Sequence, residues 1–203
     1  MNEEPTRLER GRDVAGPTRV SLSEPRTEDV PELLALARAS WRLHRPWVYL
    51  SQTHQGWRQH LHRTRQNTAV SYLIRRRDTR ELVGVINLSE IVRGVFQSAY
   101  LSFYVHAGHA RQGFMSEGLR AVVSRAFRVH RLHRVEANIQ PGNQASLRLV
   151  KGLGFRREGL SPRYLKIGRR WCDHERWAVT REIWQKGGTS GRRRESRSRS
   201  TRG

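Results

Sequence analysis

The chain has 203 residues, a length that suits one domain with flexible ends and can bury a core without a disulfide or metal staple. Its single cysteine, Cys172, excludes an internal disulfide and fits a reducing compartment. No stretch approaches the roughly 20 apolar residues of a membrane span, and the polar N-terminus lacks the apolar core of a secretion signal. The sequence therefore predicts a soluble cytoplasmic protein.

The charge balance is strongly basic, with 39 Lys and Arg residues against 18 Asp and Glu residues and a formal net charge of +21. Lysine occurs only at Lys151, Lys166 and Lys186, so nearly all basic side chains are arginine. A GC-rich genome would favour arginine codons. A partner rich in phosphate or carboxylate would be attracted by the positive field. The two explanations are compatible.

The ends of the chain differ in composition from its body. Residues 1–17 are expected to be a disordered leader, and residues 186–203 a disordered Arg/Ser-rich tail, which leaves 18–185 as the domain. The tail carries seven basic residues and one acidic residue, and so six of the 21 net positive charges. It is either a solubilising end or an arm that contacts RNA or the ribosome.

Strand and helix patterns alternate along the body of the chain. The expected elements are a strand beginning at Thr18, a helix over Val30–Trp41, a short polar helix over His54–Thr64, strands over Ala69–Arg75, Leu82–Ser89 and Ser98–His106, a helix over Met115–His130, a strand over Arg134–Gln140, a helix over Ala145–Leu153, and a hairpin over Arg163–Trp184. Pro31 is placed for a first helical turn and Gly154 for a left-handed C-cap. This order predicts a mixed sheet with helices on both faces.

The segment between the strand over Ser98–His106 and the helix over Met115–His130 carries the first chemical signal. A helix N-terminus leaves about four backbone N–H groups unpaired and carries a partial positive charge, so it binds phosphate oxygens. Gly113 would let the backbone approach a ligand closely, and Ser116 could cap the helix. The same pattern also fits an ordinary strand-to-helix loop.

Four ordered motifs extend this signal. They are His109-Ala-Arg-Gln-Gly-Phe-Met-Ser-Glu-Gly-Leu119, Leu132-His-Arg-Val-Glu-Ala-Asn-Ile-Gln-Pro-Gly-Asn-Gln-Ala-Ser-Leu-Arg-Leu-Val150, Leu153-Gly-Phe-Arg-Arg-Glu-Gly159 and Tyr164-Leu-Lys-Ile-Gly-Arg-Arg-Trp-Cys-Asp-His174. Through them residues 99–184 resemble the GCN5-related N-acetyltransferase (GNAT) family, and within it the RimJ/RimL type that acetylates ribosomal-protein N-termini. The resemblance implies a single α/β (α+β) domain. Its mixed, mostly antiparallel central sheet would be splayed between the fourth and fifth strands.

The resemblance also implies a site for acetyl-CoA and for an acceptor. Backbone N–H groups of Arg111, Gln112, Gly113, Phe114, Met115 and Ser116 would hold the pyrophosphate, and Phe103, Tyr104 and Val105 would pair with the pantetheine arm. Asn143 would contact the pantetheine or order a water. Ser146 would protonate the departing thiolate. Pro46, Trp47 and Tyr164 would contact the acceptor, although Trp47 fits a core position equally well.

The chain departs from the family pattern at several positions. Ala110 and Met115 replace usual residues of the loop, but backbone donors survive both changes. Val150 replaces the usual tyrosine acid. The glutamate base of RimI-like members falls on Asn138, and that of RimL falls on Arg163. Asn138 therefore joins Ser146 and Glu136 as a candidate catalytic residue.

The general base stays open at this level. Amine attack on a thioester needs the neutral amine, and an α-amino group with a pKa near ~8 is roughly one-tenth neutral at pH 7. Such an acceptor could use a water chain to Glu136, or to Asp173 and Glu175. Glu136 could equally form a salt bridge with Arg134, and Asp173 could brace the closing hairpin.

Other chemistry is not expected. His106 and His109 have HxxH spacing but no accompanying carboxylate cluster, so the sequence predicts no metal site. Direct transfer needs no cysteine nucleophile. The favoured function is acetylation of the N-terminal α-amino group of a ribosomal protein. The alternatives are acetylation of a small-molecule amine and a non-catalytic ribosome- or RNA-binding role.

Overall fold

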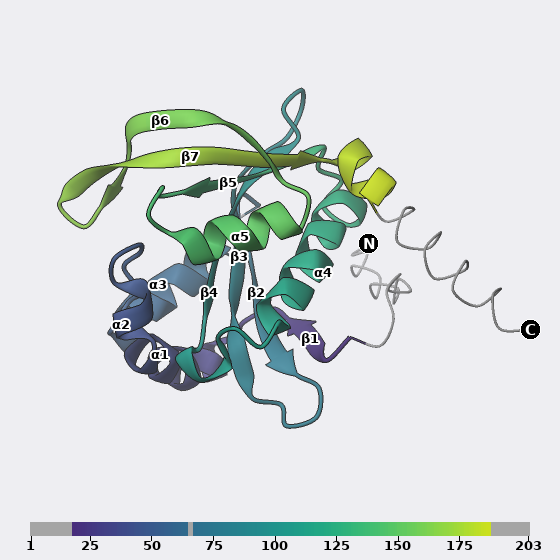
Figure 1. The fold of residues 1–203 in the computed structure, drawn as a ribbon. Coiled ribbons are helices and arrows are strands. Elements are labelled where there is room, and N and C mark those ends of the chain that lie inside the picture. The colour runs from purple at the N-terminus through teal and green to yellow at the C-terminus, as the bar shows by residue number, and fades with distance from the viewer. Residues whose placement is uncertain (1–17, 65–66, 188–203) are drawn as a thin grey trace, which may run out of the picture.

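The computed structural model describes residues 18–64 and 67–187 (Figure 1). The expected leader over residues 1–17 and nearly all of the expected tail therefore lie outside the described residues. The helices are α1 (Val30–Ala39), α2 (Trp41–His44), α3 (His54–Thr64), α4 (Phe114–Arg128) and α5 (Gln144–Gly152), with 3-10 turns η1 (Thr27–Asp29) and η2 (Ala107–His109). The strands are β1 (Val20–Ser23), β2 (Val70–Arg76), β3 (Leu82–Val92), β4 (Ser98–Val105), β5 (Arg134–Ile139), β6 (Arg156–Ile167) and β7 (Arg170–Thr180).

These strands form one seven-stranded sheet in the order β1-β2-β3-β4-β5-β7-β6. Every neighbouring pair is antiparallel except β4 and β5, which are parallel. A parallel pair needs a crossover connection, and α4 supplies it. The expected mixed, mostly antiparallel sheet is confirmed.

The parallel pair separates soon after it forms. Its register covers only Ser98–Tyr100 of β4 against Arg134–Glu136 of β5. Beyond Tyr100 the two strands have no pairing, although β4 continues to Val105. The expected splay between the fourth and fifth strands is thus confirmed, and it leaves one edge of β4 free of a strand partner. This opening is called the notch below.

The two faces of the sheet carry different helices. Because side chains alternate along a strand, Tyr72 and Ile74 pack into the core under α4 and α5, whereas Leu73 packs into the core under α1 and α3. Figure 1 shows α4 and α5 over the near face and α1 to α3 gathered at the lower left. The apolar stripe of α4 is fully buried, and its Gly118 allows close approach to the sheet, since an added Cβ would lie 3.0 Å from Ile74. Helices on both faces are confirmed.

Two residues expected to mark helix ends do so in the structure. Pro31 lies in the first turn of α1, where its missing N–H costs nothing. Gly154 follows α5 with φ of 89°, the left-handed conformation expected of a helix C-terminus.

The end of the body differs from the expected hairpin. β6 begins at Arg156, earlier than Arg163, and β7 ends at Thr180 rather than continuing to Trp184. Residues 181–187 are helical. The indole Nε1 of Trp184 donates to Ser124 Oγ on α4 at 3.1 Å, so this segment turns out of the sheet to cover α4. No helix in the described part of the chain is long and apolar enough to cross a membrane.

Candidate active site

A cavity of about 880 Å³ opens at the notch. It is bounded by β4, β5, the loop before α4, the start of α5 and the segment from α2 to α3. Eleven expected site residues line it: Trp47, Phe103, Tyr104, Val105, Arg111, Gly113, Met115, Ser116, Asn138, Asn143 and Ser146. Five expected site residues do not: Pro46, Gln112, Phe114, Glu136 and Tyr164.

The loop before α4 turns through two left-handed residues. Arg111 has φ of 62°, and Gly113, the N-cap of α4, has φ of 83°. Left-handed residues in a turn direct successive backbone N–H groups into one concavity, which binds anions. The first N–H groups of the 15-residue α4 add to this concavity because they have no partner inside the helix. The loop therefore offers backbone donors to an anion.

Arg19, the residue before β1, contacts this loop from its outer side. Its Nη2 donates to Gln112 O at 3.1 Å, and its Nε donates to Glu117 Oε1 at 2.6 Å. Its guanidinium lies 4.5 Å from the ring centroid of Phe114. Arg19 thus holds the loop through the backbone carbonyl of Gln112 and the ring of Phe114.

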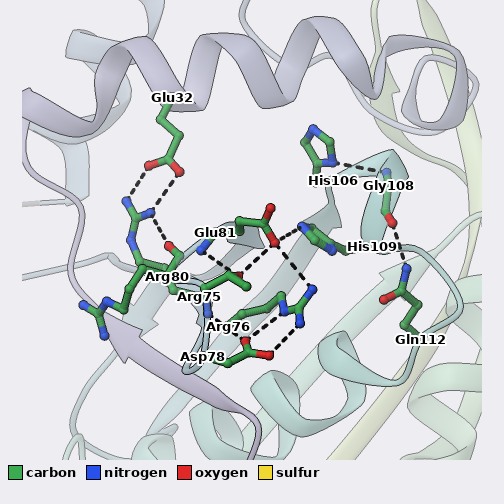
Figure 2. A network of polar contacts seen from close by, with 11 residues as sticks. Glu32, Arg75, Arg76, Asp78, Arg80, Glu81, His106, Gly108, His109 and Gln112 are labelled. Carbon is green, nitrogen blue, oxygen red and sulfur yellow. Dashed lines mark hydrogen bonds and ion pairs between the residues drawn. The ribbon is translucent and has the colours of Figure 1, made fainter.

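The turn between β2 and β3 braces the loop from below, as Figure 2 shows. Arg76 Nη2 donates to Asp78 Oδ2 at 2.6 Å and thereby holds the pKa of Asp78 down to about 2. Glu81 Oε2 lies 3.9 Å from His109 Nε2, and Gln112 Nε2 donates to Gly108 O at 2.8 Å. The turn thus contacts the loop through Glu81 and His109, and Gln112 adds a bond within the loop.

Alternate backbone groups of β4 face the notch. His106 N–H donates to Val83 O of β3 at 2.7 Å, so the groups one residue earlier, at Val105, point away from β3. By the same alternation the backbone groups of Phe103 face the notch. His44 Nε2 lies 2.8 Å from Val105 O and 3.2 Å from Val105 N, and so occupies the groups nearest the loop. Burial lowers the pKa of His44, against the opposing effect of its bond to Val105.

The start of α5 forms the opposite wall. Asn143 Oδ1 accepts the Ser146 N–H at 3.2 Å as the helix N-cap, and Asn143 also lines the cavity. Trp47 covers the preceding turn, since a Cβ on Gly142 would lie 3.1 Å from its ring. Gln140 Nε2 donates to Trp47 O at 3.1 Å. The Trp47 segment and the β5–α5 connection are thereby joined across the site.

The two candidate residues on β5 have different environments. Glu136 accepts from Arg134 Nε at 2.9 Å, and Arg134 also pairs with Glu158, so the salt bridge considered as an alternative for Glu136 is present. Asn138 lines the cavity, and its Oδ1 is buried with no hydrogen-bond partner among the described residues. Asn138 therefore lines the cavity with an amide whose oxygen, itself buried, lacks a partner among the described residues.

Comparison with known proteins agrees with this geometry. The family model described as "Acetyltransferase (GNAT) domain" matches residues 19–156, more than half of the chain. The chain belongs to the GNAT family. Two curated relatives are each 37% identical: the [Ribosomal protein uS5]-alanine N-acetyltransferase of Escherichia coli over 110 residues, and the probable N-acetyltransferase YjcK of Bacillus subtilis over 98 residues. These matches cover 54% and 48% of this chain, and 57% and 54% of the relatives, so the chain spans little more than half of either.

A solved GNAT structure shows the same fold over a longer stretch. Mycobacterium smegmatis RimJ, solved in complex with CoA-disulfide, superposes with a TM-score of 0.76 at 24% identity. The match covers 85% of this chain and 90% of that one.

The closing hairpin of this GNAT domain is braced by the residues that were considered as proton acceptors. Asp173 Oδ1 accepts the backbone N–H of Arg163 at 2.7 Å, where β6 bulges. Glu175 Oε2 accepts from Trp177 Nε1 at 3.0 Å and from Arg157 at 2.9 Å. The Tyr164 hydroxyl lies 3.5 Å from that of Tyr100, outside the cavity lining.

The described side chains that line the GNAT cavity include positive charges but no negative ones. Among the described residues that line it there is no Asp or Glu, whereas Arg63, Arg111 and Arg148 are present with four histidines. Burial lowers the pKa of His60, helped by Arg63, and burial likewise lowers the pKa of His109. The described residues contain no cluster of three metal-binding side chains.

Several lining residues escaped the sequence analysis, above all His60, Asn87 and Ser102. Their signal was present in part. Asn87 is a polar residue within the apolar strand Leu82–Val92, and Ser102 lies on the polar face of β4. Nothing local in the sequence indicates that these positions meet His60 of α3.

Proposed function

We propose that this chain transfers the acetyl group of acetyl-CoA to the α-amino group of a protein N-terminus, with a ribosomal protein as the acceptor. Membership of the GNAT family and the 37% identity to an enzyme that acts on ribosomal protein uS5 support the proposal. The observation that carries it is the lack of any carboxylate among the described residues that line the cavity.

The residues of the site fit acetyl-CoA. The left-handed turn at Arg111 and Gly113 with the N-terminus of α4 offers backbone donors for a pyrophosphate. The backbone of Phe103 faces the notch and can pair with the amides of a pantetheine arm. Bound there, acetyl-CoA supplies an activated acyl group. Ser146 lines the same cavity, where its hydroxyl can donate a proton to the departing sulfur.

The absence of a carboxylate selects the acceptor by its amine pKa. An α-amino group with a pKa near ~8 is roughly one-tenth neutral at pH 7, whereas a lysine amine near ~10.4 is neutral only a few times in 10,000. Glu136, Asp173 and Glu175 are held in other bonds. The site thus suits an amine of which about one-tenth is already neutral at pH 7, so that no strong base is needed.

The same charge distribution disfavours a polyamine acceptor. Three arginines around the cavity repel a polycation, and the described lining offers it no counter-charge. Acetylation of a small-molecule amine and a non-catalytic binding role are the alternative outcomes of the test.

The test is acetyl transfer from acetyl-CoA to a peptide that has an N-terminal alanine and one internal lysine, followed by mass spectrometry of the product. We expect acetylation at the α-amino group alone. An otherwise identical peptide with a blocked N-terminus should stay unmodified. Acetylation only of the lysine, or of spermidine in place of the peptide, would contradict the proposal.

The same assay tests the role of Ser146. Ser146→Ala should lower kcat by roughly 10- to 100-fold with little change in acetyl-CoA affinity, as expected for one positioned proton donor. Ser23→Ala, at an exposed position of β1, is the control. Wild-type turnover in Ser146→Ala, with chemistry rate-limiting, would assign proton donation to another group.

A further inference from the structure

A row of polar side chains crosses three strands on the face covered by α3. Ser71 of β2 is paired with Asn87 of β3, and Asn87 is paired with Ser102 of β4. Ser71 and Asn87 are buried, with 1% and 8% of their surfaces exposed. Buried polar groups in a sheet core cost stability unless they are hydrogen-bonded. The row is therefore expected to be held together by hydrogen bonds.

The hydrogen bonds along the row run in one direction. Ser71 Oγ donates its only hydrogen to Asn87 Oδ1 at 2.5 Å, so it can only accept from His60 Nε2, which lies 3.2 Å away. His60 Nε2 is then the protonated ring nitrogen. Burial lowers the pKa of His60 more than the hydrogen bond with Asn87 raises it, and an acceptor near the ring has such a raising effect.

The row ends at the notch. Asn87 Nδ2 donates to Ser102 Oγ at 3.2 Å, which leaves the hydrogen of the Ser102 hydroxyl to point elsewhere. Ser102 lines the cavity, and its hydroxyl has no acceptor among the described residues. Each bond in such a chain polarises the next. His60, Ser71 and Asn87 thus orient Ser102 as a hydrogen-bond donor into the cavity.

An unpaired acceptor lies across the notch from this donor. The parallel pairing ends at Tyr100 and Glu136, and Ser102 and Asn138 are each two residues further along their strands. They therefore share the face covered by α3, one on each rim of the opening. Asn138 Oδ1 is buried without a partner among the described residues. The notch thus has a hydroxyl donor on one rim and, on the other, an amide whose oxygen lacks a partner among the described residues.

An N-terminal residue carries the complementary groups. Its amino nitrogen donates, and the oxygen of its carbonyl, three bonds away from that nitrogen, accepts. We propose that Ser102 donates to the first peptide carbonyl of the acceptor while Asn138 Oδ1 accepts an N–H of its amino group. This inference rests on the proposed function and adds to it the residues that recognise a peptide. A polyamine has no carbonyl to satisfy Ser102.

The hollow beside Ser102 gives the rest of a polypeptide a path. A second hollow of about 380 Å³ shares His60, Arg63, Asn87 and Ser102 with the cavity and continues past Ser89 and Glu90. An extended acceptor can leave the notch along this side of β3 and β4. A small amine would leave this hollow unused.

The test compares an N-terminal alanine peptide with the same peptide in which the first carbonyl oxygen is replaced by sulfur, a weaker hydrogen-bond acceptor. In the wild type the thioamide should have an approximately tenfold higher KM, the size of one uncharged hydrogen bond. Ser102→Ala should raise the KM of the amide peptide by about the same factor, leave kcat unchanged, and no longer distinguish the two peptides. Ser102→Thr, which keeps the hydroxyl, should restore the difference.

Asn138→Ala separates the two contacts. It should raise the KM of both peptides equally, since its partner is the amino group that they share. Ser71→Ala should act like Ser102→Ala but more weakly, because it only orients the donor. Undiminished discrimination between amide and thioamide in Ser102→Ala, or a fall in kcat at constant KM, would overturn the inference. A wild-type protein that acetylates small amines but no peptide would instead overturn the proposed function.

Discussion

At the scale of single residues, Gly113 decides whether the loop can hold a pyrophosphate. Its φ of 83° lies in the left-handed region that side chains other than glycine rarely adopt. An added Cβ would also lie 3.0 Å from Arg19 Nη2, which braces the loop. A side chain at this position would therefore disturb both the backbone donors and their support.

We expect Gly113→Trp to abolish measurable acetyl-CoA binding in a calorimetric titration, because the indole would block the approach of the ligand to the backbone. Gly152→Trp is the matched control: Gly152 is exposed, and an added Cβ there meets nothing within 4 Å. Circular dichroism should show both variants folded. Unchanged affinity in Gly113→Trp would remove this loop from the binding site.

The sequence predicts residues of the site well where chemistry and local geometry coincide. The glycine loop at Gly113 and the helix start at Asn143 carry their own turn signals, and both line the cavity. The sequence left the salt bridge of Glu136 with Arg134 as one of two alternatives, and it did not show that Glu158 of β6 also pairs with Arg134, because that contact depends on how the strands lie together. Ser102 was not predicted as a site residue, because its hydrogen bonding depends on the pairing of three strands.

At the scale of secondary-structure elements, the short helix α2 connects the acceptor side to the sheet. It was not expected as a separate helix, since four residues carry no helical period. Tertiary contacts hold it in place, among them the hydrogen bonding of His44 to the backbone of Val105 and the packing of His44 against Tyr104. The helix over residues 181–187 was missed for a similar reason, because the packing of Trp184 on α4 outweighs the strand pattern before it. By contrast α3 agrees residue for residue with its polar helical pattern.

The attachment of α2 should depend on pH. Burial lowers the pKa of His44 below its usual value of 6.5, so the folded state favours the neutral ring more than the unfolded chain does. Its contribution to stability is complete above pH 6.5 and is lost as the pH falls through the folded-state pKa. We therefore expect Tm to fall between pH 7.5 and about 5.

His44→Gln cannot be protonated in this range, and its Tm should fall by roughly 2–4 °C less over the same interval. His54→Gln, at an exposed position of α3, should keep the wild-type pH dependence. Differential scanning calorimetry across the pH series measures all three. Equal slopes for His44→Gln and the wild type would show that His60, His109 and His130, whose pKa values are also lowered, carry the effect.

At the scale of the whole molecule, the arginine excess extends far beyond the site. Three arginines line the cavity, whereas the chain has a net charge of +21. Residues 188–203, which lie outside the described structure, hold six arginines and one glutamate in their sequence. A ribosomal acceptor lies among RNA phosphates, and arginines bind phosphates with release of counterions. We propose that this segment increases the residence of the enzyme on the ribosome without taking part in catalysis.

Deletion of residues 188–203 should leave acetylation of a free N-terminal peptide intact and weaken co-sedimentation with ribosomes at low salt. Six phosphate contacts would lose about 10³-fold in affinity between 50 and 200 mM salt, so the difference between the two proteins should shrink as salt rises. Replacing the six arginines with glutamine keeps the length and should reproduce the deletion. Co-sedimentation of the truncated protein equal to that of the full chain would assign the ribosome contact to the folded domain, and the arginines of the tail would then serve only solubility.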